Sequence, residues 1–250
     1  MLTQRHTGPA PVLEPARSEG EALLPRGMPA IVRWAAAQAD AASTGSAILA
    51  EAWHDFARGA WRMAGAFALG DRTYLVARPA APGERAPLTP TEAAVVVRVL
   101  CGEQQKAIAA DLAIAPSTAS HRCMSALRKL GVHGAPVPLP LIVAAEHAAG
   151  LAGQGARSAR FECDGSVYAV LSVRRPDMSR ARVLTPAEQE VASLFVEGLS
   201  RLEIAQSRGT SVLTVAGQVH SIFAALRLSG RYALVRCAGE IGCFEAADER

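Results

Sequence analysis

The chain is 250 residues long, half of its residues are hydrophobic, and its formal net charge is only +3. That length allows one large domain or two small ones, and so small a charge does not by itself indicate nucleic-acid binding, because the placement of the basic residues decides that. The five cysteines form no Cys-x-x-Cys pair and the six histidines have no metal-ligand spacing, which argues against a disulfide framework or a zinc site. The sequence has no apolar run near the roughly 18 residues of a membrane span and no apolar signal core at its N-terminus. We therefore expect a soluble cytoplasmic protein with no membrane partner, no cofactor and no metal.

The first 60 residues contain a polar tail and two amphipathic segments. Residues 1–26 are rich in Pro, Gly, Glu and Arg, a composition that favours a flexible tail. Helical spacing of apolar residues predicts helices from Pro29 to about Ala41 and from about Ser46 to Ala57. We predict that all three tryptophans of the chain pack in the core, because burial is the commoner use of a large aromatic side chain; they are Trp34, Trp53 and Trp61.

The hydrophobic period then changes from helical to alternating. Trp61 to Arg78 is predicted to form two strands around a Gly-Asp turn, followed by a linker rich in Pro and Ala. Leu88 to Glu92 reads LTPTE, in which Thr89 can cap a helix and Glu92 can bond back to the cap, with proline at the first helical position. The helix behind this capping box, Ala93 to about Cys101, is almost wholly apolar and is therefore predicted to be buried.

Two short helices joined by a tight turn are predicted between Ala107 and Val132. The turn runs through Ala113 and Ile114, and Pro116 begins the second helix, where a missing N–H costs nothing. The second helix has one packed face, and its other face is basic, forms hydrogen bonds and contains no acidic residue. That face consists of Ser117, Ser120, His121, Arg122, Met124, Arg128 and Lys129. Such a helix suits the major groove of DNA, which admits one helix and presents donors, acceptors and phosphates.

The second half of the chain repeats the first. After a Pro-rich connector and a short helix at Leu141 to Ala149, a second hairpin is predicted at Arg160 to Arg175. Leu184 to Glu188 reads LTPAE and matches the earlier LTPTE at an offset of 184 minus 88, or 96. Caps, helix stops and core positions match at the same offset, including Gly102 with Gly198, Ile108 with Ile204, Thr118 with Thr214 and Ser125 with Ser221. We infer a duplicated module of hairpin plus helices, whose two hairpins can pair into one sheet.

Both helical segments resemble the LuxR-type (GerE-type) helix-turn-helix domain of bacterial transcription regulators. The first shows LTPTE, a glycine at the helix end, KAIA, PSTAS and LRKLGV, and the second shows the eroded forms LTPAE, EGLS, EIA and LTV. The resemblance implies a four-helix fold whose third helix enters the major groove and whose fourth often dimerises. The expected fold is mainly α with short β-hairpins (α+β), with two tandem four-helix domains, each preceded by a hairpin. The predicted units of the first half are a tail (1–26), a helical segment (27–60), a hairpin with linker (61–87) and domain 1 (88–150). Those of the second half are a hairpin with linker (151–183) and the degenerate domain 2 (184–250).

The resemblance also implies which residues of the first copy bind DNA. Lys106 matches a lysine that touches phosphate, and Thr118 starts the recognition helix. Three residues match positions that face base edges, namely Ser120, His121 and Met124, and three can reach the backbone, namely Arg122, Arg128 and Lys129. The expected DNA-binding set is Lys106, Ser117, Thr118, Ser120, His121, Arg122, Met124, Ser125, Arg128 and Lys129. The sequence departs from the family pattern at Ala119, where the family has valine, and at the Pro-rich Val132 to Pro140, where the family has a basic loop.

The second copy departs further. Its helix Val212 to Leu226 contains no Lys, Arg, Asp or Glu and carries Gly217, which costs about 1 kcal/mol relative to alanine. We expect this copy to act mainly as a packing partner. The expected partners are double-stranded DNA, with a homodimer or an intramolecular pseudo-dimer and RNA polymerase left open. The alternative function is a protein-interaction module acting on another regulator or on the polymerase. With no P-loop, no G-x-S-x-G and no paired carboxylates, the sequence does not predict an enzyme.

Overall fold

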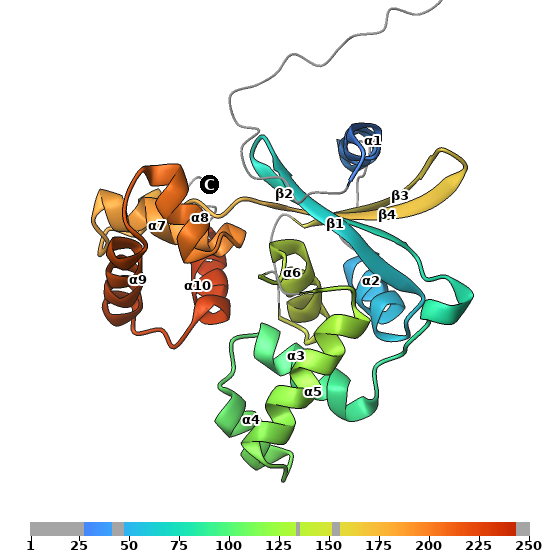
Figure 1. The fold of residues 1–250 in the computed structure, drawn as a ribbon, viewed down its shortest axis with the longest axis horizontal. Helices are drawn as coiled ribbons and strands as arrows, with labels where there is room; N and C mark the ends of the chain where they lie inside the picture. The colour runs from blue at the N-terminus through green and yellow to red at the C-terminus, as the bar shows by residue number, and fades with distance from the viewer. Residues whose placement is uncertain (1–27, 42–47, 134–135, 152–155, 244–250) are drawn as a thin grey trace, which may run out of the picture.

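The computed structural model describes residues 28–41, 48–133, 136–151 and 156–243, so the predicted tail at residues 1–26 lies outside the described residues. The described part is mixed α+β, with ten α-helices and a four-stranded antiparallel sheet, as the sequence predicts at this level. Figure 1 shows the sheet with helices on both of its faces and a second group of helices beside it.

The sheet is built from both predicted hairpins. Its strands are β1 (Trp61–Leu69), β2 (Arg72–Pro79), β3 (Arg157–Cys163) and β4 (Ser166–Arg174), in the order β1-β2-β4-β3. Two-residue loops join the strands of each hairpin, and glycine supplies the left-handed backbone that tight hairpins need, with φ of 59° at Gly70 and 69° at Gly165. The hairpin pairing that the sequence left open is therefore present, through antiparallel β2 and β4.

The central strand pair has the symmetry of a small dimer. Leu75 pairs directly with Leu171, and these two leucines are equivalent in the repeat, since 171 minus 75 is 96. A pseudo-two-fold axis therefore passes through this pair, as in the self-complementary contact of a two-fold homodimer. The symmetry stops at the sheet, because α6 (Leu139–Ala148) packs against β2 and β4 whereas α10 (Arg231–Cys243) packs against α7 (Pro186–Glu197) and the short 3₁₀ helix at Met178–Arg180.

Alternate residues of the central strands bury into two separate layers. Tyr74 and Val76 pack under α1 (Ala30–Ala41), while Leu75 and Leu171 face the opposite side, where α2 (Ile48–Ala57) and α6 lie. The core on that second side is continuous with the interiors of both helical groups. The two halves of the chain therefore share one sheet and one main core.

The helical groups follow the capping signals in the sequence. The first contains α3 (Pro90–Leu100), α4 (Gln105–Asp111), α5 (Pro116–Lys129) and α6, and the second contains α7, α8 (Arg201–Arg208), α9 (Val212–Leu226) and α10. Both predicted capping boxes form, at Thr89 with Glu92 and at Thr185 with Glu188. The glycine stops after α3 and α7, Gly102 and Gly198, adopt positive φ. These boundaries arise from interactions within four residues, which explains why the sequence predicts them.

The expectation for the tryptophans is wrong in one case. Trp53 is buried and Trp61 is half-buried under the Arg160 guanidinium, 5.8 Å from the ring centroid, but Trp34 is 64% exposed. On α1 the buried positions are Val32, Ala36 and Asp40, and a residue two positions from Val32 lies about 200° round the helix from it. Trp34 is exposed because the face of α1 that packs on the sheet carries Val32, Ala36 and Asp40, and Trp34 lies on the opposite face.

That aspartate belongs to a buried polar network that the sequence analysis missed. Asp40 Oδ2 lies 3.3 Å from Arg72 Nε, and the Ser172 hydroxyl donates to Asp40 Oδ1 at 2.5 Å. Arg72 also donates to the Ser172 carbonyl from Nη2 at 3.2 Å and to its hydroxyl oxygen from Nε at 3.0 Å. The three residues come from α1, β2 and β4, so the network joins the N-terminal helix to both hairpins.

Candidate nucleic-acid interface

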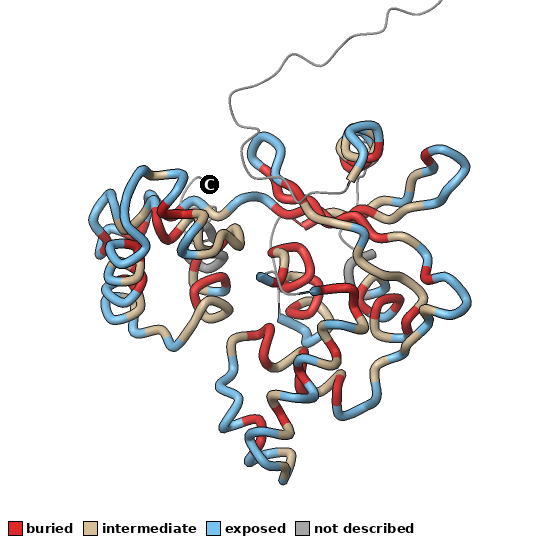
Figure 2. The backbone as a smooth tube through the Cα atoms, viewed as in Figure 1, coloured by how far each residue is buried: buried red, intermediate tan, exposed pale blue. Residues whose placement is uncertain are grey.

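Helix α5 is positioned by the turn that precedes it and by two neighbouring helices. Ala113 adopts φ of 52°, and its equivalent in the repeat is Gly209 with φ of 61°, so both copies make the same left-handed turn. Pro116 is the first residue of α5, as predicted. Ala119, Cys123 and Ala126 are buried against α3 and α4. The opposite face of α5 does not pack against these two helices, and Figure 2 shows that the end of α4 and the start of α5 are largely exposed.

Most of the predicted DNA-binding residues lie on this free side. The residues classed as exposed are Lys106, Ser117, His121, Arg122, Met124 and Arg128, and those of intermediate exposure are Thr118, Ser120, Ser125 and Lys129. Met124, a large apolar side chain, is 55% exposed with no core to explain it. Ser117, Thr118, His121 and Arg122 border a shallow hollow of about 270 Å³ at the start of the helix. The structure therefore brings the first turns of α5 together as one surface, while Lys106 lies on α4.

Two of the predicted residues have a different structural role. Lys129 Nζ lies 2.7 Å from Glu92 Oε2 and donates to the Pro87 carbonyl at 3.1 Å, while the Ser125 hydroxyl donates to Glu92 Oε1 at 2.7 Å. Glu92 is the capping-box glutamate of α3, and its side chain is 3% exposed. Burial of the Glu92 carboxyl opposes its charge, but hydrogen bonds from Lys129, Ser125 and Thr89 outweigh burial and lower its pKa to about 2. Lys129 and Ser125 therefore attach α5 to the start of α3.

The second copy repeats half of this attachment. The Ser221 hydroxyl donates to Glu188 Oε1 at 2.5 Å, so the matched serines of the repeat both hold a capping-box glutamate. The counterpart of Lys129 is Ala225, which provides no cation. Only the first copy therefore combines this serine with a lysine.

We expect the ion pair of Glu92 to make stability pH-dependent. Because the folded pKa of Glu92, about 2, lies below its ordinary value of 4.5, its contribution is complete above about pH 4.5 and is lost as the pH falls through 2. The shift corresponds to about 3–4 kcal/mol at most, at about 1.4 kcal/mol per pKa unit. Glu92→Gln should therefore lower the free energy of unfolding in urea by about 2–3 kcal/mol at pH 7 and by much less at pH 2.5. Glu188→Gln is the matched control and should cost less at pH 7, and equal losses from the two variants would contradict the role given to Lys129.

Three positions of the second copy that correspond to the α4 and α5 surface carry exposed apolar side chains. Leu202 replaces Lys106 and is 55% exposed, and Leu213 replaces Ser117 and is 83% exposed. Val212, at the position of Pro116, is 43% exposed. The uncharged α9 therefore carries exposed apolar side chains. Packing within the chain does not account for the exposure of these side chains.

Other kinds of site find little support in the described part of the chain. No group of three or more His, Cys, Asp or Glu residues there is arranged to hold a metal ion. Cys101, Cys123 and Cys163 are free and buried, as the sequence predicts for inert thiols, and burial raises the pKa of Cys101 to about 11. Within the same residues no single helix is long and apolar enough to cross a membrane, and α8 with α9 reach that length and apolarity only as a pair bent by 113°.

Comparison with known proteins adds no family assignment: no protein-family model matches the sequence, and a search of curated proteins found no relative. The interpretation of this surface rests on its own residues.

Proposed function

We propose that the chain is a DNA-binding transcriptional regulator that reads the major groove with α5. In this proposal α3–α6 and α7–α10 are two tandem LuxR-type helix-turn-helix domains, and the second serves mainly as structural support. The observation that carries the proposal is the free face of α5, which presents Arg122, Arg128, His121 and Met124 to solvent and contains no acidic side chain. A helix with a packed face and an acid-free cationic face fits the width and the potential of the major groove.

The contacts made by Lys129 and Ser125 change the residue assignment. Lys129 would lose its ion pair with the buried Glu92 carboxylate, and Ser125 its hydrogen bond, if either side chain turned to a DNA phosphate. We therefore assign both residues to support of α5. Arg122 and Arg128 remain as backbone contacts, and neither guanidinium forms an ion pair with a described residue. His121 and Met124, with Ser117 and Ser120, are proposed to face the bases.

Sequence preference tests this function most directly. We expect the full chain to select a short motif from random duplexes, and His121→Ala with Met124→Ala to change the preference by about 1–3 kcal/mol at one or two positions, since a base-edge contact discriminates by that amount. Binding constants for single-base variants of the selected site measure the effect. His220→Ala on α9 is the matched control, because His220 is the exposed counterpart of Met124 in the repeat, and it should leave the preference unchanged. A preference that no α5 substitution alters would contradict major-groove reading by α5.

A second candidate function is supported by the exposed Leu202, Val212 and Leu213 of the second copy. Exposed apolar side chains of this size favour a protein partner, such as another regulator or RNA polymerase. The same experiment separates the two candidates, because a pure protein-interaction module would select no motif from random duplexes.

A further inference from the structure

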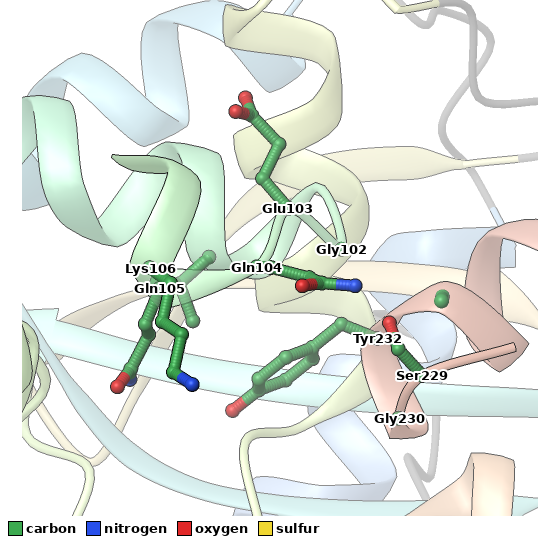
Figure 3. A pocket seen from close by; sticks show the side chains of 10 residues that line it. Gly102, Glu103, Gln104, Gln105, Lys106, Ser229, Gly230 and Tyr232 are labelled. Atoms are coloured by element: carbon green, nitrogen blue, oxygen red, sulfur yellow. The ribbon is translucent and has the colours of Figure 1, made fainter. Parts of the chain in front are cut away.

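A cleft between the two helical groups is lined by no residue of α5. One wall is the α3–α4 connection with the first turn of α4, and the other wall is the α9–α10 connection with the first turn of α10 (Figure 3). Its volume is about 490 Å³, within the range of small-molecule sites, which commonly lie where two structural units meet.

The floor of the cleft is a close approach of the two backbones. A Cβ on Gly102 would lie 3.1 Å from the Ala233 nitrogen and 3.2 Å from its Cα, and Gly102 has φ of 85°. Glycine is therefore required here both by space and by conformation. Arg236 Nη1 also donates to the Cys101 carbonyl at 3.4 Å across the same junction. The two walls are thus held at a defined separation.

Within the described residues, the cleft offers one unpaired cation to a ligand. Of the residues that line it, Lys106 and Glu103 are charged. Glu103 is paired with Arg98, whose Nη2 lies 2.6 Å from Glu103 Oε2 and is shared with Asp111 Oδ2, also at 2.6 Å, and Figure 3 shows the Glu103 carboxylate directed away from the side chains of Lys106 and Tyr232. Lys106 forms no ion pair with any described residue, so its positive charge is available to a ligand.

The uncharged groups indicate the shape of that ligand. The ring of Tyr232 forms a flat wall, with its hydroxyl toward the Lys106 and Gln105 end, while Gln104 and Ser229 line the other end (Figure 3). Burial raises the pKa of Tyr232, so its hydroxyl stays protonated and can donate a hydrogen bond. The geometry points to a planar organic anion as the occupant, an aromatic carboxylate whose charge pairs with Lys106, whose ring stacks on Tyr232 and whose second polar group bonds to Gln104 or Ser229. This site does not depend on DNA binding by α5.

The composition of the chain allows a selective test. Lys106 and Lys129 are its two lysines, and Lys129 is held by Glu92 on another part of the surface. In the full chain labelled with [ε-¹³C]lysine, we expect 4-hydroxybenzoate to shift the Lys106 signal with a Kd of about 1 mM, as expected for a ligand of this size, and to leave the Lys129 signal in place. The neutral analogue 4-hydroxybenzyl alcohol should bind at least about tenfold more weakly, because a charge-assisted bond is lost.

Variants provide a second readout. In ¹⁵N spectra the Gly102 and Gly230 amide signals report the cleft, and Lys106→Gln should weaken 4-hydroxybenzoate binding about tenfold or more. Arg201→Gln is the matched control, because it removes one exposed positive charge from the first turn of α8 and should leave affinity unchanged. Equal shifts of both lysine signals, no shift at all, or full binding by Lys106→Gln would overturn the proposal. A Lys106 signal that moves with a DNA duplex and not with 4-hydroxybenzoate would also overturn it, since the anion would then be a DNA phosphate.

Discussion

Replacing Arg122 and Arg128 together by alanine is expected to weaken binding of the full chain to all duplexes alike, by about 30-fold at 0.15 M salt. Each phosphate contact releases about 0.9 counterion, so the loss of two contacts removes about 1.8 from the slope of log K against log salt, which is roughly 30-fold at that concentration. Both residues are exposed on α5 and neither lies in the core, so the variant should fold normally. Titrations of the same duplexes at two or more salt concentrations measure both the affinity and the slope.

The matched control for this prediction is a pair of arginines in the second copy. Arg201 and Arg227 are exposed, and their replacement by alanine should reduce affinity much less if the first copy is the reader. Equal losses would mean that both copies bind DNA and that the asymmetry inferred from the uncharged α9 is wrong. Point substitutions in the full chain are required, because separate expression of residues 61–150 and 151–250 would divide β2 from β4 and expose the core that they share.

The second large effect concerns the buried network of Asp40, Arg72 and Ser172. Asp40 is 1% exposed, and Arg72→Ala would leave its carboxylate with the Ser172 hydroxyl and Arg157, 3.9 Å away, as partners. Removing one member of a buried ion pair typically costs about 3–5 kcal/mol, because the other charge remains desolvated. Burial already lowers the pKa of Arg72, despite the opposing charge of Asp40. We therefore expect Arg72→Ala to lower the free energy of unfolding by about 3–5 kcal/mol, as measured by urea denaturation.

The adjacent strand provides a close control. Arg174 lies directly opposite Arg72 in the register of β2 and β4, but its side chain is 73% exposed and its nearest acidic partner, Asp71, is 4.0 Å away. Arg174→Ala should cost less than about 0.5 kcal/mol, as is usual for an exposed pair. Adding Asp40→Ala to the Arg72→Ala variant should recover part of the loss, because no unpaired charge would then be buried. A loss of the same size from Arg72→Ala and Arg174→Ala would contradict a structural role for the network.

The sequence by itself determined the local structure of this protein. The capping boxes at Thr89 and Thr185, the glycine stops and the Asp-Gly turn of the second hairpin all depend on hydrogen bonds or backbone conformations within a few residues. The same local signals, repeated at an offset of 96, indicated a duplicated module. The acid-free face of α5 was also visible, because helical period alone determines which residues share it.

Only the tertiary structure decided which of those faces are used and how the copies meet. Lys129 appears in the sequence as one more basic residue of α5, and its engagement depends on Glu92, which is 37 residues away. The burial of Asp40 in place of Trp34 depends on Ser172, which is 132 residues away. The pairing of Leu75 with Leu171 joins residues 96 positions apart, and the cleft beside Gly102 brings that residue against Ala233, which is 131 positions away. The physical reason is that caps and turns are selected by neighbouring residues, whereas the partner of a buried charge or a strand edge is selected by the whole packed chain.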